Sequence, residues 1–348
     1  MSDSGPTLEE IHAVIEMNGG NRTDAATQLG ISRHALRRRI KRLSEEQSTQ
    51  IDGVVMPDIP TDDLPVTDII DHLSSRFEKR RAAVRARKWM RIGFESDLPI
   101  GICFLGDPHV DDSNCDWPQL RRDVDIISST EGMYGASVGD AVNNWAPRLA
   151  RLWAEQDTSR HTAWKLSRWL LSESGVDWLM WVMGNHDEWN DGSTILREMG
   201  GHPIWMHDWQ AQVELGFPKG QACRIHIAHD FPGHSMWNSL HGPQKAAHMR
   251  EPAHIYVAGH KHNWAMHQEE SASRGFVYNL IRARGYKAID HFGERLGHFP
   301  QEEGQAIVAV IDPMAKSMAS FVDTYADAER GAMVLNALRR QRRKEGVE

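Results

Sequence analysis

The sequence predicts a layered α/β domain preceded by a small helical domain, and three observations support this prediction. From residue 99 onward, apolar runs with strand spacing alternate with stretches of helical spacing. Several of these runs stop at a Gly that is followed by Asp, Asn or His, which puts polar side chains at strand ends. Before residue 46, three short stretches of helical spacing are separated by glycine-containing turns.

The composition limits the class of protein. With 348 residues, the chain can hold one large domain and one small one. Its 40 Lys and Arg against 48 Asp and Glu make it mildly acidic, so overall charge alone does not indicate a nucleic-acid partner. Cys103, Cys115 and Cys223 form no Cys-x-x-Cys pair, which argues against a disulfide framework or a thiolate zinc site and favours a cytoplasmic location. Without a signal-like start or about 18 consecutive apolar residues, we expect a soluble protein with no membrane span.

The first 45 residues have the order of a helix-turn-helix. Apolar residues at helical spacing mark a first helix that ends at Gly19 and Gly20, and a second helix ends at Gly30. Ser32 can then cap a third helix that runs to Leu43. The apolar positions of the three helices are Leu8, Ile11, Val14 and Ile15, then Ala25, Ala26 and Leu29, then Leu36, Ile40 and Leu43.

Residues 8–43 resemble the Fis-type helix-turn-helix of bacterial enhancer-binding regulators, through Gly-Gly-Asn, Ala-Ala, Leu-Gly-Ile-Ser-Arg and Leu-x-x-Arg-Ile. The resemblance implies that DNA is a partner, with the third helix contacting it. Base edges would then face Arg33, His34 and Arg37, and phosphates would lie nearer Arg38, Lys41 and Arg42. The alternative is a solvated basic face on a small helical adaptor. One such module per chain suggests a homodimer, because these modules commonly read two half-sites.

The predicted domain boundaries follow changes in composition. They are a helix-turn-helix at 1–45, a flexible linker at 46–65, an amphipathic basic helix at 66–95, the α/β domain at 96–325 and a basic C-terminal helix or tail at 326–348. In the 66–95 helix, we expect an apolar stripe to pack on the core and the cations to face solvent, with a nucleic-acid track as the alternative. The stripe consists of Val66, Ile69, Ile70, Leu73 and Phe77. The basic end of the chain is expected to be a solvated tail.

Within the α/β domain the spacing predicts seven strands and four helices. The strands are 100–105, 134–138, 176–183, 224–228, 255–258, 275–280 and 306–311, and the helices are 117–127, 147–155, 162–172 and 244–249. Asp107 and His109 follow the first strand, and residues two apart in an extended segment point to the same side. They can therefore converge on one metal ion. The same format recurs at Gly139-Asp140, Gly184-Asn185-His186-Asp187, Ala228-His229-Asp230 and Gly259-His260-Lys261-His262.

Together these blocks resemble the five signature blocks of the calcineurin-like metallophosphoesterases, over Ile100 to His262. The chain as a whole is similar to the members encoded by tailed phages and prophages, which would place it in the host cytoplasm. The resemblance implies a four-layer αββα sandwich with two divalent metal ions. It also implies the ligands: Asp107, His109 and His262 for the first ion, Asn185, His229 and His260 for the second, and Asp140 between them. Oxygen and nitrogen ligands without thiolate favour Mn²⁺, with Fe or Zn²⁺ as alternatives.

Three further residues are candidates for catalysis. The resemblance makes His186 the group that faces the scissile phosphate and protonates or stabilises the leaving oxygen, and Asp187 is expected to orient its imidazole. Asn143 and its neighbour Asn144 are candidates to hydrogen-bond a phosphate oxygen, with loop capping as the alternative.

The sequence thus predicts a metal-dependent phosphoester hydrolase, with DNA favoured as substrate because a DNA-reading module is attached. Two alternatives remain. One is a nucleotide or phosphoprotein phosphatase that the first domain only localises. The other is a DNA-binding regulator with an inactive phosphatase fold.

Overall fold

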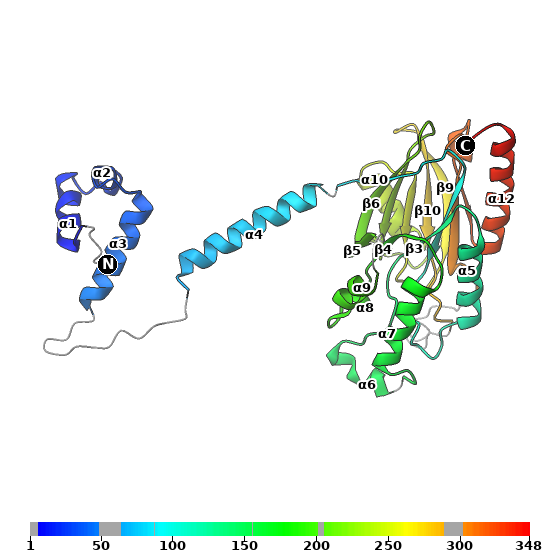
Figure 1. Ribbon diagram of the computed structural model, residues 1–348, viewed down its shortest axis with the longest axis horizontal. Helices are drawn as coiled ribbons and strands as arrows, with labels where there is room; N and C mark the ends of the chain where they lie inside the picture. Colours follow the sequence, from blue (N-terminus) through cyan, green and yellow to red (C-terminus); the bar gives the residue numbers. More distant parts are fainter. Residues whose placement is uncertain (1–5, 49–63, 87, 155, 201–204, 289–301) are drawn as a thin grey trace. The chain divides into compact units, whose positions relative to one another are not determined.

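The computed structural model describes residues 6–48, 64–86, 88–154, 156–200, 205–288 and 302–348. The chain divides into two compact units, Met1–Phe77 and Glu78–Glu348 (Figure 1). Most of the linker predicted at 46–65 lies outside the described residues. In the parts of the chain that the structure describes, no helix combines the length and the apolar character that crossing a membrane requires.

The first unit contains the predicted three-helix arrangement. Its helices are α1 (Leu8–Met17), α2 (Arg22–Gln28) and α3 (Arg33–Ser48). A capping box between Thr7 and Glu10 begins α1, and Asn21 caps α2. Ser32 begins α3, since its hydroxyl oxygen accepts the backbone N–H of Ala35 at 3.1 Å. The buried side chains Ile11, Ala25, Ala26 and Leu36 form a small core between the helices.

Two helices differ in length from the sequence prediction. Helix α3 continues to Ser48, so it includes the first residues of the predicted linker. Helix α4 (Val66–Ala86) stops well before residue 95, and strand β1 (Met90–Gly93) follows it. The reason is burial, because Met90 enters the core and its backbone pairs with Val213. Within the first unit, the residues of the predicted stripe on α4 are exposed, with Val66 at 70% and Ile70 at 55%, and their expected packing on the core stays a prediction.

The second unit is built on two six-stranded sheets (Figure 1). One has the order β12-β11-β2-β3-β4-β5 and the other β1-β6-β7-β8-β10-β9. The strands are β2 (Ile100–Leu105), β3 (Met133–Ser137), β4 (Trp178–Val182), β5 (Trp205–His207), β6 (Gln210–Gly216), β7 (Cys223–Ala228), β8 (Ile255–Ala258), β9 (Ala265–Ser271), β10 (Phe276–Arg282), β11 (Ala306–Ile311) and β12 (Val322–Tyr325). Strands β2 to β5 run parallel in the first sheet, and β7, β8 and β10 run parallel in the second.

The two sheets pack face to face with helices outside them. Apolar side chains from both sheets, among them Phe104, Val213 and Val257, form one buried cluster between them. Helices α5 (Trp117–Ser129) and α12 (Ala328–Lys344) cover the outer face of the β2 sheet, and α10 (His241–Met249) covers the other. The other helices among the described residues are η1 (Pro147–Leu149), α6 (Ala150–Ala154), α7 (Arg160–Arg168), the π-helix η2 (Trp169–Glu173), α8 (Asn185–Glu188), α9 (Gly192–Gly200) and η3 (Met318–Ser320). The predicted four-layer αββα architecture is therefore confirmed.

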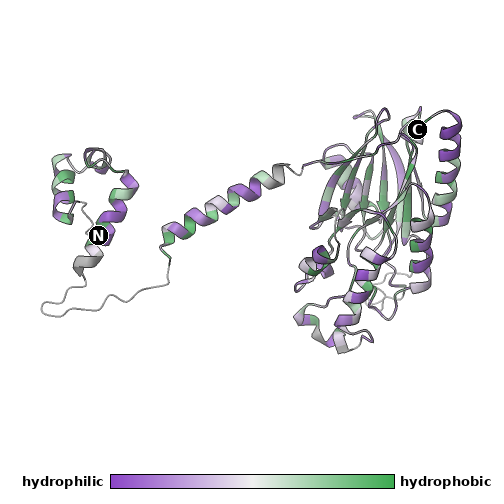
Figure 2. Cartoon of the chain, viewed as in Figure 1, coloured by the Kyte–Doolittle hydropathy of each residue, from purple (hydrophilic) through white to green (hydrophobic). Residues whose placement is uncertain are grey.

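The C-terminal helix belongs to the fold rather than forming a solvated tail. Leu335 is fully buried, and Arg339 is only 8% exposed. The Arg339 guanidinium donates to the Pro99 carbonyl at 2.8 Å and to Glu131 at 2.7 Å. In the last turn of α12, Arg342 bonds the Asp312 carboxylate and fixes the end of the helix. The expected solvated end was wrong because these cations bond groups of the fold, while the apolar residues earlier in α12 pack against it. Figure 2 shows hydrophobic and hydrophilic residues together on this helix.

Candidate metal centre

The candidate site lies where the central parallel strands end. Asp107 follows β2, and Asp140 follows β3 in the same sheet. In the facing sheet, His229 follows β7, and His260 and His262 follow β8. The carboxyl ends of parallel strands lie at one edge of a sheet, so stacking the two sheets brings these residues together.

Among the residues that the structure describes, three groups of side chains are close enough for a metal ion to bind between them. They are Asp107, His109 and His262; His109, Asp140 and His186; and Asp140, His229 and His260. Within each group, one potential ligand atom per residue lies within 4.8 Å of the others. His109 and Asp140 each belong to two of the groups, and Asp140 is the residue that joins the His109 side of the site to the His229 side.

The second sheet contributes the tighter contacts. His229 Nε2 lies 3.3 Å from Asp140 Oδ2, 3.1 Å from Asn185 Oδ1 and 3.0 Å from His260 Nδ1. In the other group, His262 Nε2 is 3.4 Å from Asp107 Oδ2, and His109 Nε2 is 3.9 Å from Asp140 Oδ2. The structure therefore brings all seven predicted ligand side chains to one place.

Several polar atoms here fit a cation better than they fit their protein neighbours. Among the described residues, Asp107 Oδ1 and both ring nitrogens of His109 are buried and accept or donate no hydrogen bond. Leaving one such group unsatisfied costs roughly 1–3 kcal/mol. A ligand bond to a divalent cation would satisfy them, and the oxygen and nitrogen donors suit Mn²⁺, Fe or Zn²⁺.

Hydrogen bonds to backbone groups orient two of the candidate ligands. The Nδ1 atom of His229 lies 2.7 Å from the Val138 carbonyl oxygen, so Nδ1–H donates there and Nε2 is left for the site. The Oδ2 atom of Asp107 accepts the backbone N–H of His260 at 2.8 Å. This bond links the end of β2 to the loop after β8, and it therefore ties the two sheets together at the site.

The backbone is strained at the ligands themselves. His109, Asp140, His260 and His262 have φ values of 42°, 54°, 69° and 47°, in the left-handed region that residues other than Gly rarely adopt. Each such position costs on the order of 1–3 kcal/mol, and the surrounding fold must maintain it. Gly184 permits the close packing, since a Cβ at this residue would lie 2.0 Å from Asp140 Oδ1.

The electrostatics of the cluster favour positive charge. Burial alone would lower the pKa of His229, but Asp140 and Asp107 raise this pKa to about 10. Burial would raise the pKa of Asp140, yet His229 and His186 hold it well below its usual value. For His109, burial and then His186 lower the pKa, which keeps the ring neutral and able to bind a metal. Without a metal, a proton on His229 supplies the positive charge that the two carboxylates stabilise, and a metal ion bound at Nε2 would replace that proton.

His186 stands at the edge of the cluster, where rings surround its imidazole. The centroids of Trp189, His109 and Trp145 lie 4.2, 4.9 and 5.2 Å from the centroid of the His186 ring. Nδ1 hydrogen-bonds the Asn143 carbonyl oxygen. The backbone N–H of His186 donates to Asp140 Oδ1 at 2.9 Å.

The predicted role of Asp187 in orienting this imidazole was wrong. Its carboxylate is fully buried and accepts the backbone N–H groups of Asp140, Ala141 and Gly184 at 2.7, 2.9 and 2.9 Å. Asp187 therefore fixes the loop that carries Asp140, and the Asn143 carbonyl holds the imidazole instead. A backbone acceptor leaves no mark in the sequence, which is why sequence reasoning missed it.

The two asparagines expected to contact phosphate are engaged within the loop. The Asn143 amide donates to Asp112 Oδ2 at 3.0 Å, and the Asn144 amide donates to the Trp189 carbonyl at 2.5 Å. Both side chains are 1% exposed. This geometry favours the loop-capping alternative over a phosphate contact. Trp145 and Trp189, the tryptophans beside His186, were assigned no role from the sequence, because nothing in the sequence distinguishes them from tryptophans of the core.

In the first unit, the six predicted DNA-contacting residues lie on the exposed surface of α3. Arg33, His34, Arg37, Arg38, Lys41 and Arg42 are all exposed. Arg39 was not among the predicted contacts, and it is half-buried and donates to the Pro6 carbonyl at 3.0 Å. The amphipathic pattern of α3 thus places the six predicted contact residues on the exposed face, and it places Arg39 where its side chain bonds the backbone before α1.

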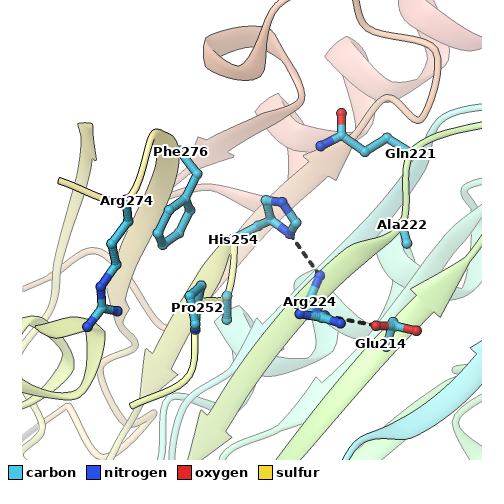
Figure 3. Close-up of a pocket in the computed structure, with 9 residues that line it drawn as sticks. Glu214, Gln221, Ala222, Arg224, Pro252, His254, Arg274 and Phe276 are labelled. Atoms are coloured by element: carbon cyan, nitrogen blue, oxygen red, sulfur yellow. Dashed lines mark hydrogen bonds and ion pairs between the residues drawn. The ribbon is translucent and has the colours of Figure 1, made fainter. Parts of the chain in front are cut away.

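A cavity of about 440 Å³ lies where β7, β8 and β10 begin, at the opposite ends of these strands from the candidate metal ligands. Figure 3 shows the side chains that line it. Its charged lining is already paired: Arg224 Nε is 2.8 Å from Glu214 Oε2, and the Arg224 backbone N–H donates to His254 Nδ1 at 2.9 Å. Because these charged groups bond one another, they are not arranged to bind a ligand in the cavity, and the cavity is not the candidate site.

The chain thus combines a helix-turn-helix with a two-sheet α/β domain that holds a cluster of side chains able to bind a metal ion. Residues 8–43 match the family described as bacterial regulatory protein, Fis family. Among solved structures, the NAD nucleotidase NadN of Haemophilus influenzae aligns with 67% of this chain at 8% identity and a TM-score of 0.37. The aligned part spans 50% of that nucleotidase, and the TM-score is too low for an argument about function. The search of curated proteins finds no match to this chain.

Proposed function

We propose that this chain is a dimetal-dependent phosphoester hydrolase that acts on DNA. The observation that carries the proposal is the convergence of Asp107, Asp140 and His229, with their partner ligands, at the ends of strands from two different sheets. The unsatisfied buried atoms of Asp107 and His109 support cation binding independently of any resemblance. A retired site would not need to maintain four ligands in left-handed backbone conformations.

The ligand side chains divide into two sets around Asp140. Asp107, His109 and His262 would hold one divalent cation, and Asn185, His229 and His260 the other. When bound, such a pair would stabilise charge on the phosphoryl oxygens and supply a nucleophilic water near neutral pH. We favour Mn²⁺, with Fe or Zn²⁺ as alternatives, because the donors mix oxygen with imidazole nitrogen.

His186 would act on the leaving group. Because Nδ1 is engaged with the Asn143 carbonyl, Nε2 is the ring nitrogen that can serve the reaction. In its protonated form, His186 transfers the Nε2 proton to the leaving oxygen as the P–O bond breaks, so that no alkoxide is released. Trp145 and Trp189 flank the ring and limit its rotation.

The first unit supports nucleic acid as the substrate class. A Fis-family match with an exposed basic α3 helix fits a module that captures DNA, and the residues proposed for this contact are Arg33, His34, Arg37, Arg38, Lys41 and Arg42. We propose that this module reads DNA as a homodimer and delivers it to the metal centre in the cytoplasm of a host cell. The proposal keeps the order of domains inferred from composition, with the ends of α3 and α4 and the packing of α12 as the structure has them.

A substrate panel tests the proposed function. Purified full-length protein would be freed of metal, loaded with Mn²⁺, Fe²⁺, Zn²⁺ or Mg²⁺, and given single-stranded DNA, duplex DNA, RNA, a chromogenic phosphodiester, a nucleotide monoester and a phosphopeptide. We expect metal-dependent cleavage of the phosphodiesters, fastest on DNA with Mn²⁺. Cleavage of the monoesters alone would favour a phosphatase, and no turnover with any metal would favour a DNA-binding regulator with an inactive fold.

A further inference from the structure

Asp111 is a buried carboxylate that the proposed metal centre does not use. It lies two residues after His109, is 1% exposed, and belongs to none of the three groups that could hold an ion. A carboxylate is buried at a large cost unless hydrogen bonds compensate it. The partners of its two oxygens therefore indicate what the residue is for.

Each oxygen of Asp111 holds one branch of a hydrogen-bond network. Oδ1 accepts the backbone N–H of Asn143 at 2.7 Å, and Oδ2 accepts the Gln156 amide at 2.7 Å. Gln156 passes the second branch on, because its Oε1 accepts the indole N–H of Trp145 at 3.0 Å. Donors and acceptors alternate along the network, which fixes the amide orientation of Gln156.

Both branches end at the His186 imidazole. The first branch fixes Asn143, whose carbonyl oxygen bonds His186 Nδ1. The second branch fixes Trp145, whose ring meets the His186 ring in an edge contact at 5.2 Å and 69°. One carboxylate thus sets both the hydrogen bond that decides the tautomer of His186 and a ring contact that limits its rotation.

We infer that Asp111 is a positioning residue for His186, which it aligns with the leaving oxygen through Asn143 and through Gln156 and Trp145. The inference rests on the proposed function, since it concerns the general acid of that reaction. The contribution of a general acid depends strongly on its placement, because small displacements of a reacting group cost large factors in rate. Asp111 touches neither the substrate nor the ions.

Two substitutions, at Asp111 and at Gln156, distinguish a positioning role of Asp111 from a purely structural one. Asp111→Asn keeps an acceptor for Asn143 but turns an N–H toward the Gln156 amide, so two donors face each other and the Trp145 branch breaks. Adding Gln156→Glu restores an acceptor toward residue 111 and keeps one toward the Trp145 indole. The double variant also has the same net charge as the wild type.

Two substrates that share a thymidine 5′-phosphate and differ in the leaving group report on His186. A p-nitrophenolate leaves without a proton, whereas a nucleoside hydroxyl needs one. For D111N, we expect kcat on the dinucleotide to fall about 10-fold or more and kcat on the aryl ester to change by less than about threefold. Metal content and melting temperature should stay near wild type, KM should be unchanged, and D111N/Q156E should recover most of the dinucleotide rate.

The tautomer of His186 can be measured by NMR without any enzymatic turnover. In ¹⁵N-histidine spectra of the metal-free protein, the His186 ring signals are identified by their loss in His186→Gln. Wild type should show the tautomer protonated at Nδ1, D111N a mixture, and D111N/Q156E the wild-type pattern. Equal loss on both substrates, loss of metal in D111N, or an unchanged His186 tautomer would overturn the inference. If wild-type protein hydrolyses neither substrate with any metal, the proposed function fails, and these spectra still decide the positioning role.

Discussion

The helix-turn-helix and the metal centre hold their functional side chains in opposite ways. On α3 the six predicted contact residues are exposed and project from a regular helix over a core of four buried side chains. At the metal centre, Asp107, His109, Asp140 and His229 are at most 2% exposed, and two of these four are among the left-handed residues. The first region is therefore locally encoded, whereas the second depends on contacts between distant segments.

This difference determines how strongly a single substitution should affect DNA binding or turnover. A cation on α3 is exposed and is one of several, so removing it should weaken binding without abolishing it. A candidate ligand such as Asp140 is buried, is held by the surrounding fold and belongs to two of the groups that could bind an ion. The largest effects of substitution are therefore expected at the candidate metal centre.

Replacing the shared ligand should have the largest effect. We expect Asp140→Asn to abolish turnover and to lower the bound metal, because the residue stands between both ligand sets. His186→Ala should reduce turnover by roughly 100-fold to 10,000-fold while metal is retained, since only proton transfer is lost. Metal analysis and steady-state rates on both variants measure this. If His186→Ala lost metal as completely as Asp140→Asn, His186 would be a ligand and not the general acid.

A pair of glycine substitutions compares the two regions directly. In Gly184→Ala the new Cβ would lie 2.0 Å from Asp140 Oδ1, so the ligand must move. A shift of about 1 Å costs on the order of 100-fold in rate, and we expect a loss of that size on a chromogenic phosphodiester. In Gly30→Ala, φ is +67° but nothing lies within 4 Å, so the cost is about 1–2 kcal/mol in the stability of the helix-turn-helix alone. Ester turnover by Gly30→Ala should match wild type; comparable losses in both variants would mean that the two regions are coupled.

The same contrast explains which features could be predicted from the sequence. Capping residues and apolar spacing specify the three helices before residue 46, and buried apolar runs specify strands such as β2 and β11. Strand β9 was not predicted because its residues Ala265–Ser271 are partly or fully exposed and show no apolar alternation. It is held in place by pairing with β10, and this long-range contact has no local signal.

Some features of the candidate site could likewise be predicted from the sequence, and others could not. Motif order indicated which side chains meet, because the ends of parallel strands converge whatever the details of the loops. The left-handed backbone at His109 and Asp140 was not predictable, since only the completed fold makes residues other than Gly adopt it. The carbonyl that holds His186 and the network from Asp111 to Trp145 use backbone groups and an amide from a separate loop. Their roles at the reacting phosphate stay predictions.

Removing the first region tests whether it serves the second. If residues 1–45 bind DNA and 46–65 act as a tether, captured DNA is presented to the metal centre at an effective concentration that can reach about millimolar. Deleting residues 1–65 should raise KM on duplex DNA that carries a bound site, without changing kinetics on a chromogenic phosphodiester. Lower salt should widen the difference. Equal DNA cleavage by both forms at low salt would contradict a tethered nuclease.

The smallest and most selective effects are expected on α3, where two neighbouring arginines should differ. Arg37 is predicted to face base edges, so Arg37→Ala should cost about 1–3 kcal/mol on the preferred site and relax its specificity. Arg38 is predicted to contact phosphate, so Arg38→Ala should weaken binding to all sequences and lower the slope of log K against log salt by about one. Binding titrations across a salt series measure both quantities. Arg22→Ala is the matched control, because Arg22 is an exposed arginine on α2 outside the predicted contact surface. If Arg22→Ala changed affinity and slope as much as Arg38→Ala, the effect would be one of general charge and not of a recognition helix.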